Sequence, residues 1–387
     1  MTTANPPPLL ALLAVIACIS ITGLSMGLTI PLISLRLEMQ GVDTLAIGLM
    51  AAAPALAILV TAPWVPALVA HMGGRGALLV GLGLAAGCLV AMAHSHHYGL
   101  WLGLRLLLGA ATGVLFTVAE TWINRLAPPA RRGRWVGIYA TVFSLCLAAG
   151  PALLTWFDAF AGSPATPFWL AAGLCLAAAL PLVALPGEPR GEAPAETRGL
   201  LDFIRRRRLW CAAVGLFAAL DAVALALFPL FGLRHGFEPA AAAGMATALV
   251  AGNVLFQLPI GWLADRLDVE ALLRRASGLL ALGAAALPAA VALDKSLVWP
   301  LLLVVGAAAG GLYTLVLIGV GHHHRGAELV TANAAIALVW GLANWLGPLV
   351  ASAAMALLDP DGLSYSLALG AGLLWLAAKT PGRRPRQ

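Results

Sequence analysis

The chain has 387 residues, of which 61% are apolar and only 10% are charged, and its formal net charge is +6. Soluble domains have about a quarter of their residues charged, so a chain this long and this apolar is expected to use lipid as its solvent. The basic residues lie between apolar runs, which favours contact with a membrane surface over nucleic-acid binding.

The N-terminal segment M-T-T-A-N-P-P-P has no basic residue ahead of an apolar run of about 27 residues. A cleaved signal peptide has a basic start and a shorter apolar core. We therefore expect this run to be an uncleaved first membrane span.

Twelve apolar runs follow one another, each long enough for a helix to cross the hydrocarbon core, which takes about 20 residues. They cover roughly 9–35, 45–71, 76–94, 99–124, 134–157, 167–186, 209–233, 239–264, 275–293, 297–320, 328–357 and 362–379. The sequence thus predicts an all-α membrane protein with twelve transmembrane helices in two six-helix bundles.

One long polar interruption, 187–208, divides six spans from six. Its glycine, proline and glutamate content is typical of a flexible linker. We expect an N-terminal bundle over 1–186, a cytoplasmic linker over 187–208 and a C-terminal bundle over 209–387. The end of the linker, L-L-D-F-I-R-R-R-R, is a candidate for a short interfacial helix.

The lysines and arginines predict the orientation. With the N-terminus inside, 19 of the 23 lie in cytoplasmic segments, and the outer segments hold only Arg36, Arg234 and Lys295. The remaining one, Arg105, lies inside a span. The positive-inside rule therefore places both termini in the cytoplasm.

The second half of the chain repeats the first. Gly109 corresponds to Gly306, and Gly150 corresponds to Gly347, both at an offset of 197 residues. Self-similarity at half the chain length indicates two similar halves, and an even number of spans per half makes them parallel repeats.

Short motifs carry a resemblance to a known family. Residues 261–266, G-W-L-A-D-R, open like the loop motif G-x-L-A-D-R-x-G-R-R, and 66–75, P-A-L-V-A-H-M-G-G-R, is a degraded first copy. Arg105 begins a stretch similar to a fourth-helix arginine motif, and Gly150-Pro151 ends one similar to a fifth-helix motif associated with exporters. Through these motifs and all twelve spans, the chain resembles the major facilitator superfamily.

The resemblance implies two six-helix bundles and charge contacts at an inner gate, in which the acid of the loop motif takes part. Ala70 occupies the acidic position of the first copy. The resemblance therefore assigns the gate to Asp265 and Arg266, with Arg75 as the arginine that the first copy retains. Residues 119–124, A-E-T-W-I-N, also resemble a little-characterised bacterial subgroup of presumed transporters.

Asp221 is the most informative single residue. It lies near the middle of the seventh span, where an acidic residue costs about 2.5–3.5 kcal/mol to insert. We interpret it as a proton-coupling or substrate-binding carboxylate. The alternative is a structural pair with a polar neighbour.

The fourth span carries two charges that its repeat lacks, because Arg105 corresponds to Leu302 and Glu120 to Leu317. Arg105 is a candidate proton-relay partner or anion-binding group, and the alternative is an arginine that snorkels outward or binds helix carbonyls. Glu120, near the inner end, fits a transport role or an interfacial ion pair. The two lie about 22 Å apart along one helix and cannot pair there.

Uncharged polar residues suggest a moderately polar path. Thr22 and Ser25 share a face of the first span, Asn253 and Gln257 share a face of the eighth, and Asn344 lies in the eleventh. Taken singly, each is explained as well by hydrogen bonding between helices.

Histidines cluster at 94, 96 and 97 and at 322–324. Consecutive histidines on a short loop rarely converge on one ion, so we expect solvated loops with no metal and no cofactor. The chain has no phosphate-binding loop and no nucleophile elbow, so nothing in it favours an ATPase or a hydrolase.

The interpretation is a secondary active transporter of the bacterial inner membrane. We expect a monomer that moves a small solute by alternating access, with protons as the coupling ion. One alternative is uptake of a metal or cofactor, which only the histidines suggest. Another is a membrane receptor or assembly factor on the same fold.

Overall fold

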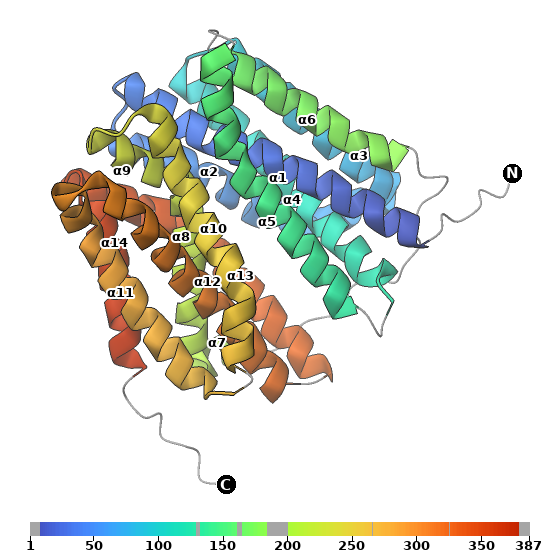
Figure 1. Cartoon of the computed structure of the whole chain (residues 1–387). Helices are drawn as coiled ribbons and strands as arrows, with labels where there is room; N and C mark the ends of the chain where they lie inside the picture. The colour runs from blue at the N-terminus through green and yellow to red at the C-terminus, as the bar shows by residue number, and fades with distance from the viewer. Residues whose placement is uncertain are drawn as a thin grey trace, which may run out of the picture. The chain divides into compact units, whose positions relative to one another are not determined.

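The computed structural model describes residues 8–128, 132–160, 165–183, 200–264, 266–324 and 326–378, and all regular structure in these ranges is helical (Figure 1). The α-helices are α1 (Pro8–Met39), α2 (Thr44–Thr61), α3 (Val65–Ala93), α4 (Tyr98–Leu126), α5 (Arg132–Phe160), α6 (Thr166–Val183), α7 (Leu200–Arg206), α8 (Arg208–Ala226), α9 (Phe228–Arg234), α10 (Pro239–Ala264), α11 (Val269–Leu293), α12 (Val298–His323), α13 (Gly326–Leu357) and α14 (Gly362–Ala377). Two short 3₁₀ turns, η1 (Ala62–Trp64) and η3 (Lys295–Leu297), join neighbouring helices.

Ten helical stretches of the described chain are long and apolar enough to cross a membrane. One of them, Thr44–Ala93, has 50 residues, more than twice what a single crossing needs. Its helical path is interrupted at Gly73, whose φ of 77° is left-handed and suits glycine. This stretch therefore contains the second and third predicted spans, and the shorter α14 supplies the twelfth.

The seventh predicted span is broken. Helix α8 ends at Ala226 and α9 begins at Phe228, with Pro229 in the first turn of α9. Proline suits this position because the first turn of a helix needs no donor there. Helix α7 lies at the predicted end of the linker, so the short helix expected there is present.

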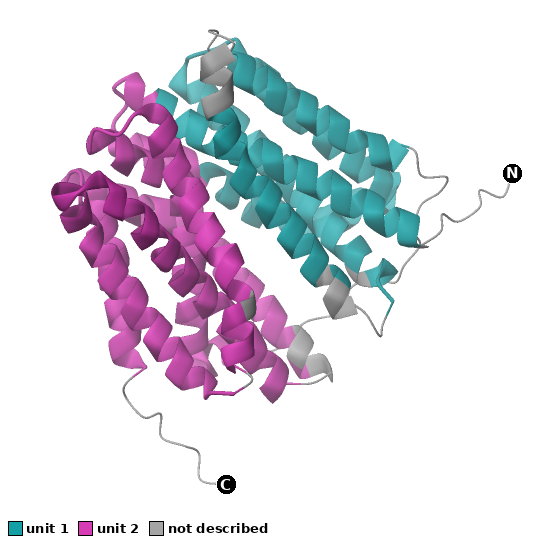
Figure 2. Cartoon of the chain, viewed as in Figure 1, with its two compact units in different colours: residues 1–36, 53–194 teal, residues 37–52, 195–387 magenta. Residues whose placement is uncertain are grey.

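The contacts divide the chain into two compact units, which Figure 2 colours separately. Unit 1 comprises 1–36 and 53–194, and unit 2 comprises 37–52 and 195–387. The end of α1 and the first half of α2 thus group with unit 2. The predicted boundary at 186 lies outside the described residues, and the predicted domain limits stay a prediction.

In unit 1, α3 packs against α4 and α6. The buried core joins α1 to these helices through residues such as Ile19, Leu78, Leu115 and Trp122. Large apolar side chains also lie on the outside, as Leu180 of α6 does at 68% exposure. Helices that are apolar both inside and outside the packed bundle are expected where lipid is the solvent.

In unit 2, α10 packs against α12, α8 against α13, and α11 against both α12 and α14. A β-carbon at Gly306 of α12 would overlap the Leu249 carbonyl of α10, and one at Gly109 of α4 would overlap Pro54 of α2. Small residues permit such close helix approaches. The sequence repeat that relates the two glycines is therefore also a repeat of helix crossings.

Candidate functional site

Asp221 lies in the last third of α8, near the middle of the predicted span 209–233, beside a small cavity within unit 2. The cavity measures about 10 Å³, room for about one water molecule, and Phe217, Asn253 and Gly306 also line it. Within the described part of the chain, the Asp221 carboxylate makes no hydrogen bond and no ion pair. The acid that the sequence singled out thus faces a mostly apolar recess formed with α10 and α12.

Two amides of α10 are joined to each other next to this cavity. The Gln257 Nε2 donates to the Asn253 Oδ1 at 3.1 Å, as the spacing of four residues on one helix face allows. Gly310 of α12 faces Asn253, and a β-carbon there would overlap the Asn253 oxygen. The absence of a side chain at Gly310 therefore makes room for the amide.

One residue of an aromatic pair, Phe217, lines the same cavity. Phe217, one helical turn before Asp221, stacks on Tyr313 of α12 with ring centroids 5.0 Å apart and an angle of 20° between the rings. Such offset stacking adds to the packing of two helices. Sequence reasoning missed Phe217, although its spacing of four residues from Asp221 on one helix was a usable signal.

Asn344 ties α13 to α8. Its Nδ2 donates to the Ala218 carbonyl at 3.3 Å, three residues before Asp221. This is the inter-helix hydrogen bond that was the alternative interpretation. A role for Asn344 in a solute path stays a prediction.

The predicted path residues Thr22 and Ser25 of α1 lie in unit 1 and are buried. The Thr22 hydroxyl donates to the Cys18 carbonyl of its own helix at 2.9 Å. The Ser25 hydroxyl donates to the Ala171 carbonyl of α6 at 3.1 Å. These donors are used in packing, and their place in a solute path is likewise untested.

The two charges of α4 lie in different surroundings. Arg105 is 5% exposed, so its guanidinium is enclosed by unit 1. Glu120 is exposed and accepts a hydrogen bond of 3.4 Å from the Tyr139 hydroxyl of α5. Their separation along α4 agrees with the expectation that they do not pair.

Of the three predicted gate residues, Asp265 lies outside the described residues. The Arg75 Nη2 donates to the Val183 carbonyl, the last residue of α6, at 2.7 Å, where it satisfies a free helix-end acceptor. The Arg266 guanidinium lies 3.7 Å from the centre of the Trp262 ring, as a cation on an aromatic face. The gate therefore stays a prediction.

His94, His97 and His323 each make a separate local hydrogen bond. The His94 Nδ1 lies 2.9 Å from the Val90 carbonyl, and the His97 Nδ1 accepts the Leu100 N–H at the start of α4. The His323 Nδ1 lies 2.8 Å from the Gly319 carbonyl. In the part of the chain that the structure describes, no three metal-ligating side chains come together.

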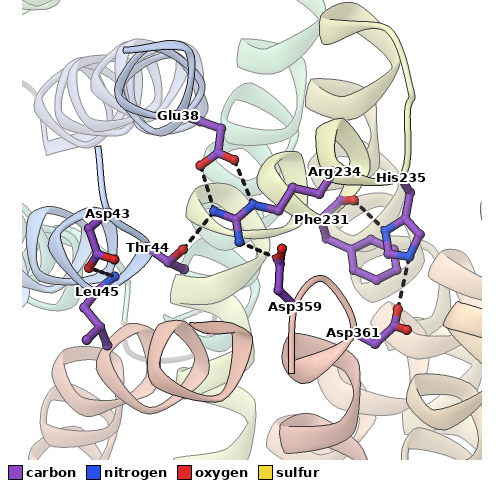
Figure 3. A network of polar contacts seen from close by, with 9 residues as sticks. All are labelled: Glu38, Asp43, Thr44, Leu45, Phe231, Arg234, His235, Asp359 and Asp361. Atoms are coloured by element: carbon purple, nitrogen blue, oxygen red, sulfur yellow. Dashed lines mark hydrogen bonds and ion pairs between the residues drawn. The ribbon is translucent and has the colours of Figure 1, made fainter. Parts of the chain in front are cut away.

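Sequence reasoning missed a second polar cluster, which we call the Arg234 cluster: Arg234, Glu38, Thr44 and Asp359, all within unit 2 (Figure 3). The Arg234 Nε and Nη2 donate to the two Glu38 oxygens at 2.7 and 3.0 Å. Its Nη2 also donates to the Thr44 Oγ1 at 2.8 Å, and its Nη1 to the Asp359 Oδ1 at 2.5 Å. The hydrogen bonds to Glu38 hold the pKa of Arg234 above its usual value.

The sequence held a signal for this cluster. Glu38, Arg234 and Asp359 all lie in short polar segments of a chain that has few charges. Arg36 and Arg234 also follow equivalent prolines in the two halves, yet Arg36 lies over the Phe168 ring at 5.1 Å. The repeated scaffold therefore carries different chemistry at the same position.

Residues 15–348 match the sequence pattern of the Major Facilitator Superfamily. The chain belongs to this family. Membership makes it a multi-pass membrane transporter rather than an enzyme, and it identifies the twelve-helix architecture as the fold of the superfamily.

Two bacterial relatives in the superfamily match most of this chain. An uncharacterized MFS-type transporter of Bacillus subtilis (strain 168), YfkF, is 26% identical over 368 residues, which cover 93% of this chain and 92% of the relative. An uncharacterized MFS-type transporter of Yersinia pestis (strain Pestoides F) is 25% identical over 71% of this chain and 70% of its own length.

Solved structures of superfamily transporters share the fold. A mutant of the nucleoside transporter NupG matches with a TM-score of 0.76 at 14% identity, over 95% of this chain and 98% of the other. A D-xylose-proton symporter matches with a TM-score of 0.73 at 16% identity, over 96% of both chains. At these identities the likeness concerns the fold, so the chemistry must come from this chain's own residues.

Proposed function

We propose that the protein is a secondary active transporter that moves a small solute by alternating access, and that the Asp221 carboxyl couples this movement to protons. The observation that carries the proposal is the position of Asp221: well inside the seventh span, beside a small cavity, with no ion pair or hydrogen bond among the described residues. A lone carboxylate in such surroundings is costly unless it binds something.

Proton uptake removes this cost, because a neutral carboxylic acid is far easier to bury than a carboxylate. The cavity beside Asp221 has room for about one water, and a water at that place would be the immediate donor of the proton to the carboxyl. Solute and proton are coupled if binding of one at this carboxyl changes the binding free energy of the other. Such linkage is reciprocal, which is what coupled transport requires.

The neighbouring amides have a supporting role in this proposal. Asn253 lines the same cavity as Asp221, and Gln257 fixes the orientation of the Asn253 side chain through the hydrogen bond to its oxygen. We assign Asn253 to the recognition of the solute or of the protonated acid, and Gln257 to positioning. The D-xylose-proton symporter among the structural neighbours is a proton-coupled transporter by its name, which is compatible with this mechanism.

The proposal extends to placement in the membrane. The distribution of lysine and arginine supports both termini on the cytoplasmic side of a bacterial inner membrane. We propose that the protein acts as a monomer, with an N-terminal bundle over 1–186, a linker over 187–208 and a C-terminal bundle over 209–387.

The test is Asp221→Asn in proteoliposomes, with a solute first identified by thermal-shift screening of the purified protein. The amide resembles a protonated acid and cannot release a proton. Asp221→Asn is therefore expected to abolish accumulation driven by a pH gradient while it permits downhill exchange. The matched control is Asp202→Asn, the same change at an exposed aspartate of α7 that pairs with Arg206.

Gradient-driven accumulation by Asp221→Asn at the wild-type level would rule out the coupling role. If Asp221 were structural, the variant would instead melt at a lower temperature, and the surviving protein would stay fully coupled. If the wild-type protein transports none of the solutes tested, the receptor alternative is favoured.

A further inference from the structure

The segment 37–52 belongs to a different compact unit from the residues on either side of it in the chain. It contains the last turn of α1 and the first half of α2, whose remaining residues belong to unit 1, yet its own contacts group it with unit 2 (Figure 2). Both ends of the segment are continuous with unit 1. What holds it to unit 2 therefore bears directly on any rearrangement of the two halves.

The Arg234 cluster is one such hold. Glu38 and Thr44 come from the segment, Arg234 ends α9, and Asp359 lies between α13 and α14 (Figure 3). The guanidinium fork matches both Glu38 oxygens, which gives a directional contact that a lysine cannot reproduce. The Arg234 side chain is 18% exposed and that of Glu38 is 20% exposed, so solvent screens the pair only in part.

His235, the residue after Arg234, contacts the loop that carries Asp359 of the Arg234 cluster. The His235 Nε2 lies 3.0 Å from the Asp361 Oδ1, and its Nδ1 lies 2.8 Å from the Phe231 carbonyl. Asp359 and Asp361 belong to the same short loop, so His235 fixes the loop that presents Asp359 to Arg234 (Figure 3). Two consecutive side chains thus fasten this loop and the segment 37–52 to the end of α9.

We propose that Arg234 is the centre of a latch that holds the segment 37–52 on unit 2 in one state of the transport cycle and releases it in another. The proposal rests on the alternating access of the proposed function. In such a cycle the two halves exchange contacts, and a segment continuous with one unit and bound to the other is where the proposal places one of these exchanges. Hydrogen-bonded ion pairs suit this task, because water takes over both partners when they separate.

The latch lies at the end of the helices that the lysine and arginine distribution places on the non-cytoplasmic side of the membrane. Release of the latch would therefore belong to opening of the outer side. In this proposal Arg234 is a positioning residue, because it holds the segment 37–52 and is given no contact with the solute.

Cysteine labelling measures release without any solute. Ile47 lies in the segment and its side chain is fully buried, so Ile47→Cys should react slowly with a water-soluble maleimide in the purified full-length protein. The background carries Cys146→Ser, because Cys146 is the partly exposed cysteine and the other four are buried. Arg234→Gln is expected to raise the labelling rate by about tenfold or more, because loss of one partner leaves charged groups unpaired.

A double-mutant cycle tests whether the two residues act through each other. Glu38→Gln should also raise the rate, and the double variant should label no faster than Arg234→Gln alone. Arg234→Lys keeps the charge and loses the fork, so its rate should fall between wild type and Arg234→Gln. The control is Arg206→Gln, which removes an arginine from an exposed ion pair with Asp202 and should leave the rate unchanged.

Unchanged labelling in both Arg234 variants would overturn the latch, and so would additive effects of the Glu38 and Arg234 changes. If Arg234→Gln fails to fold, as judged by gel filtration and melting, Arg234→Lys and Glu38→Gln decide the matter. The readout needs neither solute nor pH gradient. If the labelling experiment contradicts the latch, the coupling role of Asp221 is unaffected. If the transport experiment contradicts the coupling role of Asp221, the labelling result is unaffected.

Discussion

Gly310 of α12 packs so closely against Asn253 of α10 that a β-carbon at position 310 would overlap the amide oxygen of Asn253. Asn253 lines the same cavity as Asp221. Gly310, which has no side chain, therefore controls the placement of a polar group next to the central acid.

Gly310→Ala should displace the Asn253 amide and disturb the cavity. We expect the transport rate of an identified solute to fall by about tenfold, since displacements of about 1 Å in a site can have large effects. The control is Gly321→Ala in the same helix, where an added β-carbon meets nothing within 4 Å. Equal transport by the two variants would show that the position of Asn253 does not matter.

Gly306→Ala should destabilise unit 2. Its β-carbon would overlap the Leu249 carbonyl, and backbone cannot move aside as a flexible side chain can. We expect a loss of about 1–3 kcal/mol, seen as a lower melting temperature of the purified protein. Gly103→Ala, at an exposed position of α4 with open space, should melt at the wild-type temperature or slightly above it. A stable Gly306→Ala would mean that α10 and α12 can separate at little cost.

Cysteines placed at Ser95 and at position 162 should react with an impermeant maleimide added to intact cells. Both positions lie in segments that the lysine and arginine distribution places outside. Position 162 lies outside the described residues, and Ser95 lies between α3 and α4. Reaction at both positions only after permeabilisation would reverse the proposed topology.

The gate assignment predicts a difference between the two copies of the loop motif. Asp265→Asn should impair transport, because it removes the acid from the copy that retains it, whereas Ala70→Asp should do little harm. Initial transport rates, normalised to the amount of protein in the membrane, measure both effects. The opposite ranking would assign the gate to the first copy and to Arg75.

The amino-acid sequence predicted the helical class, the spans and the internal repeat, because each depends on local hydropathy or on residue identity along the chain. It also predicted that Asn253 and Gln257 share a helix face, which the hydrogen bond between them confirms. Breaks within spans were less visible. The separation of α8 from α9 lies inside the seventh predicted span and depends on backbone angles that apolar composition does not encode. The interruption at Gly73, in contrast, falls in the gap between the second and third predicted spans.

The side-chain partners across helices could not be predicted, and the reason is physical. In lipid, both the packed and the outer faces of a helix are apolar, so hydropathy gives little information about which way a helix is rotated. The sequence alone determined that Asp221 is an acid in the middle of a span and that the chain has two related halves. Only the tertiary structure decided that Asp221 shares a cavity with Asn253 and that Glu38 meets Arg234 across 196 positions of the chain, because helix rotation and packing set those distances.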